Sequence, residues 1–78
     1  MSKSNIFGKP HTHTLEEFVY PERGVGKILQ MTTTIDVNGY ADTLFKCYYI
    51  VYKTHTWFLR AESKNYLEVL KVYDNITI

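Results

Sequence analysis

Residues 25–52 read VGKILQMTTTIDVNGYADTLFKCYYIVY, in which Asn38-Gly39 separates two runs rich in β-branched and aromatic residues. Asn-Gly readily takes the positive φ angles of a type I′ turn, and the twist of that turn suits a two-residue hairpin loop. The stretch therefore predicts an antiparallel hairpin. A two-residue loop places Leu29 opposite Tyr48, and this register determines which side chains share a face of the sheet.

The two runs differ in how their apolar residues are distributed. Over residues 25–37 apolar and polar residues alternate, which is typical of a strand with one covered face. Over residues 43–52 both faces are apolar, which indicates a central strand covered on two sides. We therefore expect another element to cover the second face of this strand.

Turn residues divide the rest of the chain into further elements. Residues 11–20 predict a strand or a single helical turn, and a turn follows at residues 21–24. A second turn at residues 53–56 leads into a strand over residues 57–62.

The segment 65–74 is ambiguous between a helix and a fourth strand. Asn65 followed by Glu68 has the spacing of a capping box, and the apolar residues fall on one helical face, so we favour the helix. A short strand at 76–78 closes the expected chain.

These elements predict one α+β domain over residues 11–78, preceded by a flexible leader over residues 1–10. Its fold is a small antiparallel sheet of three to four strands, with a hairpin at Asn38-Gly39 and one short C-terminal helix. The expected core consists of Leu29, Met31, Ile35, Leu44, Ile50, Trp57, Leu59, Leu67 and Leu70.

Length and cysteine content limit how this domain is stabilised. A chain of 78 residues buries a small share of its surface, and the usual supplements are disulfides, metals or oligomerisation. The lone Cys47 excludes an internal disulfide and favours a reducing compartment, and we expect it to be a small buried hydrophobe. Homo-oligomerisation therefore belongs among the expectations.

Charge and hydropathy exclude some classes of function. Nine basic and eight acidic residues give a net charge near zero, so the protein has no long-range electrostatic field that attracts polyanions. This disfavours a nucleic-acid binder whose affinity depends on charge. No export signal or membrane-spanning run is visible, so we expect a cytoplasmic protein without a membrane partner. The abundance of Lys, Asn, Ile, Tyr and Phe suits an AT-rich gene, either of a phage or mobile element or of an AT-rich bacterium.

One motif is typical of metal ligands. His11, His13, Glu17 and Gly24 have a spacing that resembles the second part of the first cupin motif, and the resemblance implies a divalent transition metal held by the first three. The second cupin motif does not follow in the sequence. A metal-binding, cupin-like fragment is therefore our second alternative, and the first expectation is no cofactor.

Aromatic residues carry the principal functional hypothesis. The chain has seven Tyr, four Phe and one Trp, more large rings than so small a domain readily buries. Tyrosine is favoured at protein interfaces because it offers contact area at little entropic cost. The predicted partner-binding residues are Tyr48, Tyr52, Lys53, His55 and Arg60.

No Ser, Cys or Asp beside His55 in the sequence completes a nucleophile–base pair, so we expect a protein that is not an enzyme. We expect a small protein-binding module that inhibits or modulates its partner by occupying the partner's surface. The alternative is a module that stacks single-stranded RNA or DNA on a tyrosine-rich sheet face.

Overall fold

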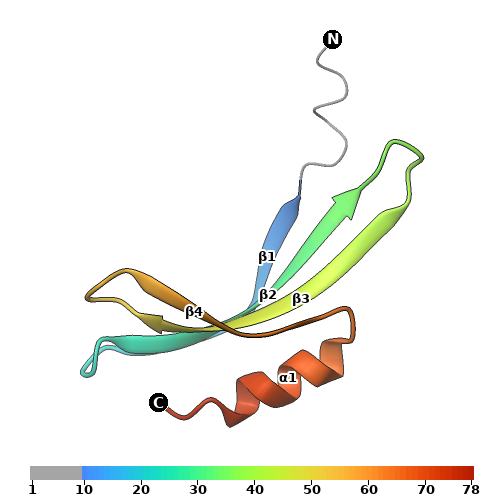
Figure 1. The fold of residues 1–78 in the computed structure, drawn as a ribbon. Coiled ribbons are helices and arrows are strands. Elements are labelled where there is room, and N and C mark those ends of the chain that lie inside the picture. The colour runs from blue at the N-terminus through green and yellow to red at the C-terminus, as the bar shows by residue number, and fades with distance from the viewer. Residues whose placement is uncertain (1–9) are drawn as a thin grey trace.

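The fold consists of four consecutive antiparallel strands followed by one helix. The computed structural model describes residues 10–78. Its elements are β1 (His11–Tyr20), β2 (Val25–Ile35), β3 (Ala41–Val51), β4 (Thr56–Ser63) and α1 (Tyr66–Asn75). The strands form one twisted sheet in the order β1-β2-β3-β4, and α1 packs beneath it (Figure 1). The predicted α+β class, its C-terminal helix and its central hairpin are confirmed.

Two predictions at the chain ends have different outcomes. The leader predicted for residues 1–10 lies outside the described residues except for Pro10. The short strand predicted at residues 76–78 is wrong, because the chain continues there without regular structure.

The loop of the central hairpin has three residues, not the predicted two. The backbone N–H of Gly39 donates to the Asp36 carbonyl at 3.0 Å, and the N–H of Asp36 donates to the Tyr40 carbonyl at 3.0 Å. The carboxylate of Asp36 accepts two further bonds, from the N–H groups of Asn38 at 2.9 Å and Tyr40 at 3.0 Å. This arrangement is a type I turn followed by a glycine with φ +86°, the usual form of a three-residue hairpin loop.

The extra loop residue shifts the predicted register by one. Leu29 pairs with Cys47, not with Tyr48, and Met31 pairs with Phe45. Because partners in an antiparallel ladder project to the same side, this shift moves each side chain of β3 to the face opposite the predicted one. Cys47 therefore lies on the side of α1, and Tyr48 lies on the other side.

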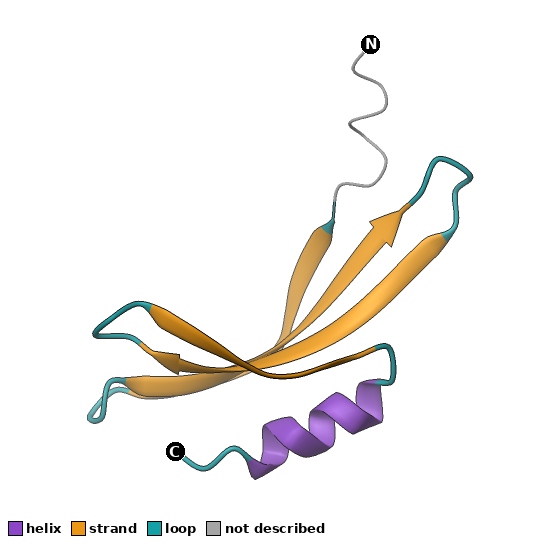
Figure 2. Ribbon diagram, viewed as in Figure 1, coloured by secondary structure: helices purple, strands orange, loops and turns teal. Residues whose placement is uncertain are grey.

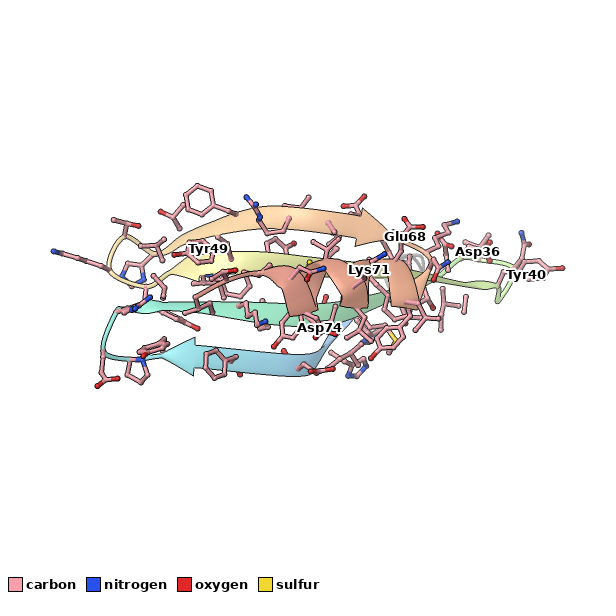
Figure 3. The ribbon with its side chains drawn as sticks, turned by 90° about the horizontal axis from the view of Figure 1, so that it is seen from below. Asp36, Tyr40, Tyr49, Glu68, Lys71 and Asp74 are labelled. Carbon is pink, nitrogen blue, oxygen red and sulfur yellow. The ribbon has the colours of Figure 1, made fainter. Side chains whose placement is uncertain are left out.

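The two faces of the sheet have different environments. The helix face is the side on which α1 contacts β2, β3 and β4, and the open face is the opposite side. No element within residues 10–78 covers the open face (Figure 2). Seen from the helix side, α1 lies over β2 and β3 and runs roughly along them, and the loop that carries Asp36 and Tyr40 extends beyond it (Figure 3).

The core between α1 and the helix face is small. It consists of Leu29, Cys47, Val69 and Tyr73, which are 0–4% exposed. The partly buried side chains packed against it are Phe45, Ala61, Tyr66, Leu70, Val72 and Ile76. The expected burial of Cys47 is confirmed.

The predicted core was partly wrong. Leu29 and Ile50 are buried as expected, and Met31, Leu44 and Leu70 are half-buried. The side chains predicted as core but found exposed are Ile35, Trp57, Leu59 and Leu67. The buried side chains that the prediction missed, apart from Cys47, are Ile28, Val69 and Tyr73.

Helix α1 is fixed at both ends by hydrogen bonds. One half of the predicted capping box is confirmed, because the Asn65 side chain accepts from the N–H groups of Leu67 at 3.0 Å and Glu68 at 3.4 Å. The other half is wrong, because the N–H of Asn65 donates to the Ser63 hydroxyl at 3.0 Å and not to Glu68. At the other end Lys27 reaches across from β2, and its ammonium group donates to the carbonyls of Tyr73 at 2.8 Å and Ile76 at 3.3 Å. Lys27 thereby places a cation where the helix dipole is negative.

Candidate protein-binding face

The open face carries two apolar rows that cross the sheet near one end. One row runs from Val19 on β1 through Gly26 and Ile50 to Trp57 on β4. The next row contains Glu17, Ile28, Tyr48 and Leu59 in the same strand order. We call Val19, Tyr48, Tyr52, Trp57 and Leu59 the open-face patch.

Aromatic rings of the patch bury two isoleucines without a second layer of structure. Ile28 is 5% exposed and Ile50 is 1% exposed, although both point away from α1. The rings of Tyr48 and Trp57 meet edge to face, with centroids 5.3 Å apart. The patch therefore has the packing of a core but is open to solvent on its outer side.

Glycine at position 26 makes room for the Tyr52 ring. A Cβ at Gly26 would lie 2.9 Å from the Tyr52 hydroxyl oxygen and 2.7 Å from the Phe18 carbonyl oxygen. The Tyr52 hydroxyl is buried against this backbone and has no hydrogen-bond partner among residues 10–78. The missing side chain thus lets the hydroxyl end of the Tyr52 ring pack against the backbone of β2.

The outer side of the patch is strongly exposed. Trp57 is 48% exposed, Leu59 is 52% exposed and Val19 is 41% exposed. Scattered apolar residues are normal on a protein surface, but contiguous apolar patches mark interaction sites. Trp57 and Leu59 are neighbours on one face of β4 and are contiguous, whereas Val19 lies in the same row on β1, with β2 and β3 between them.

Apart from half-buried Leu44, the rest of the open face is polar, and most of its charges are paired. Lys46 lies 4.0 Å from Glu62, and Lys64 lies 2.9 Å from Asp42. Toward the same end the hydroxyls of Thr12 and Thr32 are 3.1 Å apart. Glu17 is the one charged residue in the two apolar rows, so the patch itself has almost no electrostatic field of its own.

The structure brings four of the five predicted partner-binding residues to one end of the sheet. Tyr48 and Tyr52 belong to the patch. Lys53 and His55 are exposed in the β3–β4 turn beside it, where His55 has a φ of +54°.

Arg60, the fifth predicted residue, lies on the helix face. It has no partner in the ladder, because Cys47 pairs with Ala61 and Tyr48 pairs with Leu59. This extra residue in β4 directs the arginine into a cleft of about 530 Å³ beside the C-terminal end of α1. The cleft is lined by Tyr49, Arg60, Val72, Asn75, Ile76 and Thr77.

Sequence reasoning missed Val19 and assigned Trp57 and Leu59 to the core. The sequence contains a signal that Trp57 or its neighbours must be exposed, because all three residues from Trp57 to Leu59 are apolar. In an edge strand of eight residues with one helix available, the two faces cannot both be covered.

The three predicted metal ligands are not brought together. His11 pairs with Thr33 and His13 pairs with Met31, which places both histidines on the helix face. The ladder then shifts at Leu15, so that Glu17 pairs with Ile28 on the open face. Residues 10–78 contain no group of three His, Cys, Asp or Glu side chains positioned to hold a metal ion.

The buried thiol is not placed for chemistry. Burial raises the pKa of Cys47, although a backbone hydrogen bond with Ala61 and the positive charges of Arg60 and Lys27 act in the opposite direction. A thiol nucleophile needs a lowered pKa and access to solvent, and Cys47 has neither.

Comparison with protein families, curated proteins and solved structures found no match for this chain. Within residues 10–78, none of the helical structure has the length and apolar character needed to span a membrane.

Proposed function

We propose that this protein is a small, non-enzymatic protein-binding module that works through the open-face patch. The observation that carries the proposal is the contiguous aromatic and aliphatic surface around Trp57 and Leu59, which lies over buried Ile28 and Ile50. Interface hot spots are enriched in Trp and Tyr set in well-packed surroundings.

The same surface defines a mode of action. A rigid sheet presents the patch, and Lys53 and His55 stand at its rim as polar contacts that select the partner. Binding inhibits or modulates the partner by covering part of its surface. A cytoplasmic accessory protein of a phage or mobile element fits this role and the AT-rich composition.

The test is binding that depends on the patch. We expect Leu59→Lys to abolish capture of the partner from the cytoplasm of the native host, and Leu67→Lys to leave it intact. Leu67 is the matched control, because it is 69% exposed but lies on α1, away from the patch. The captured protein is then purified and titrated against both variants by calorimetry.

Equal capture by the wild type and both variants would overturn the proposal. So would a purified partner that binds Leu59→Lys as tightly as the wild type.

Nucleic-acid binding is the second candidate, and the Tyr48–Trp57 ring pair supports it. Single-stranded nucleic acids stack on such rings, and Lys46 and Lys53 lie near them on the same face or its rim. Pairing of Lys46 with Glu62 and the near-neutral net charge favour the protein partner instead. Titration with single-stranded RNA at increasing salt separates the two, because affinity that falls steeply with salt supports nucleic-acid binding.

A further inference from the structure

We propose that the occupant of the open-face patch is a second copy of this chain, so that two sheets pack face to face with the α1 helices outside. The inference rests on the proposed function, that the patch binds protein, and it names the partner. Three properties of residues 10–78 support it: the number of apolar side chains left exposed, the size of the open face and the distribution of charge on that face.

The single chain leaves more large apolar side chains exposed than it buries. Within residues 10–78, six apolar side chains are buried and ten large ones are exposed. Of those ten, Val19, Trp57 and Leu59 belong to the open-face patch. Ile28 and Ile50 already form the base of a second core, which lacks an opposing layer. A second copy supplies that layer with the same kind of side chains.

The open face is large enough for a stable dimer. Strands of 8–11 residues at about 3.3 Å per residue, set about 4.8 Å apart, give a face of roughly 600 Å² per copy. Two such faces bury about 1,200 Å² in total, which reaches the range of specific interfaces.

The charge distribution permits contact between identical surfaces. Two copies bring the same charges together, so an unpaired cluster of one sign would repel itself. On this face Lys46 is near Glu62 and Lys64 is paired with Asp42, the five side chains of the patch are uncharged, and Glu17 at the β1 edge is the one charge in their two rows.

The position of the patch fixes the symmetry. It lies at the end of the sheet that carries the β1–β2 and β3–β4 turns, so a two-fold axis through it brings Trp57 and Leu59 of the two copies together. Sheets in sandwiches pack about 10 Å apart and cross at about 30°, which accommodates the twist of this sheet.

Trp57 is the single tryptophan of the chain and reports directly on this interface. We expect sedimentation and light scattering of the whole protein to show a dimer, with Trp57 emission shifting to the blue as concentration rises. Leu59→Lys should raise the dissociation constant at least about thirtyfold. Leu67→Lys should leave it unchanged, and circular dichroism of both variants checks that the sheet is intact.

A wild-type protein that stays monomeric, with solvent-exposed Trp57 emission at all concentrations, would overturn the inference. If Leu59→Lys still abolishes capture of another protein, the proposed function survives that result. A dimer unaffected by Leu59→Lys would place the interface elsewhere and would also overturn the inference. If Leu59→Lys does not fold, Trp57→Thr with the same light-scattering readout replaces it.

Discussion

The backbone at Gly39 has a conformation that side chains resist. Its φ is +86°, and a Cβ built there meets no atom within 4 Å. The cost of a side chain at this position is therefore conformational and involves no steric clash with neighbouring residues.

We expect Gly39→Val to lower the free energy of unfolding by about 1–2 kcal/mol, because a β-branched residue strongly disfavours positive φ. Gly39→Asn should cost less, since Asn tolerates this region. Urea unfolding followed by circular dichroism measures both. Equal stability of the valine variant and the wild type would contradict the assigned turn.

The neighbouring Asp36 explains why the sequence predicted the place of this turn but not its length. The Asn38-Gly39 pair correctly marks the reversal. The Asp36 carboxylate then binds the N–H groups of Asn38 and Tyr40, which closes a loop one residue longer. A side-chain bond of this kind competes with the type I′ turn, and the dipeptide pattern contains no information on it.

Among the elements, the N-terminus of α1 is the boundary that the sequence marks most clearly. Asn65 accepts two N–H groups that the helix itself leaves without partners. These two bonds orient the first turn over Phe45, whose ring lies 5.3 Å from that of Tyr66.

Asn65→Ala should lower the free energy of unfolding by about 1 kcal/mol, because the first turn of α1 loses its cap. Asn65→Asp keeps an acceptor and should stay close to the wild type. Thermal unfolding distinguishes the two variants. A loss as large for aspartate as for alanine would show that the side chain acts in some other way.

Strand positions were predictable, but strand faces were not. Alternation and turn residues located β2, β3 and β4, because these signals are local. The faces depend on the loop length after Ile35 and on the unpaired residues Leu15 and Arg60, each of which reverses the alternation. Nothing local marks those two residues, so Glu17 and Arg60 were assigned to the wrong sides.

Across the whole molecule, the core contains two groups that ionise in alkali. Burial raises the pKa of the Cys47 thiol above its ordinary value of 9.0. Burial also raises the pKa of the Tyr73 hydroxyl above its ordinary value of 10.0, and the carboxylates of Glu16 and Asp74 add to that rise. The folded state thus binds both protons more tightly than the unfolded state does.

Below pH 9.0 the contribution of these two groups to the free energy of unfolding should therefore be constant. As the pH rises above 9.0, the free energy of unfolding should decrease. Urea unfolding at a series of alkaline pH values measures the slope. Cys47→Ala lowers stability at every pH, but it should also flatten the first part of the decline. A slope that is unchanged in this variant would exclude the thiol as a cause.

The order of the elements along the chain also determines when the core closes. Each strand pairs with its neighbour in sequence, so the ribbon of strands requires no distant segment to assemble. Val69 and Tyr73, half of the central cluster, come from the element after the last strand. A nascent or truncated chain that stops at Ser63 would present Leu29 and Cys47 to water on one side and Trp57 on the other. We expect such a chain to be bound by chaperones and degraded by proteases, so that a premature stop codon before α1 has the same effect as loss of the whole gene product.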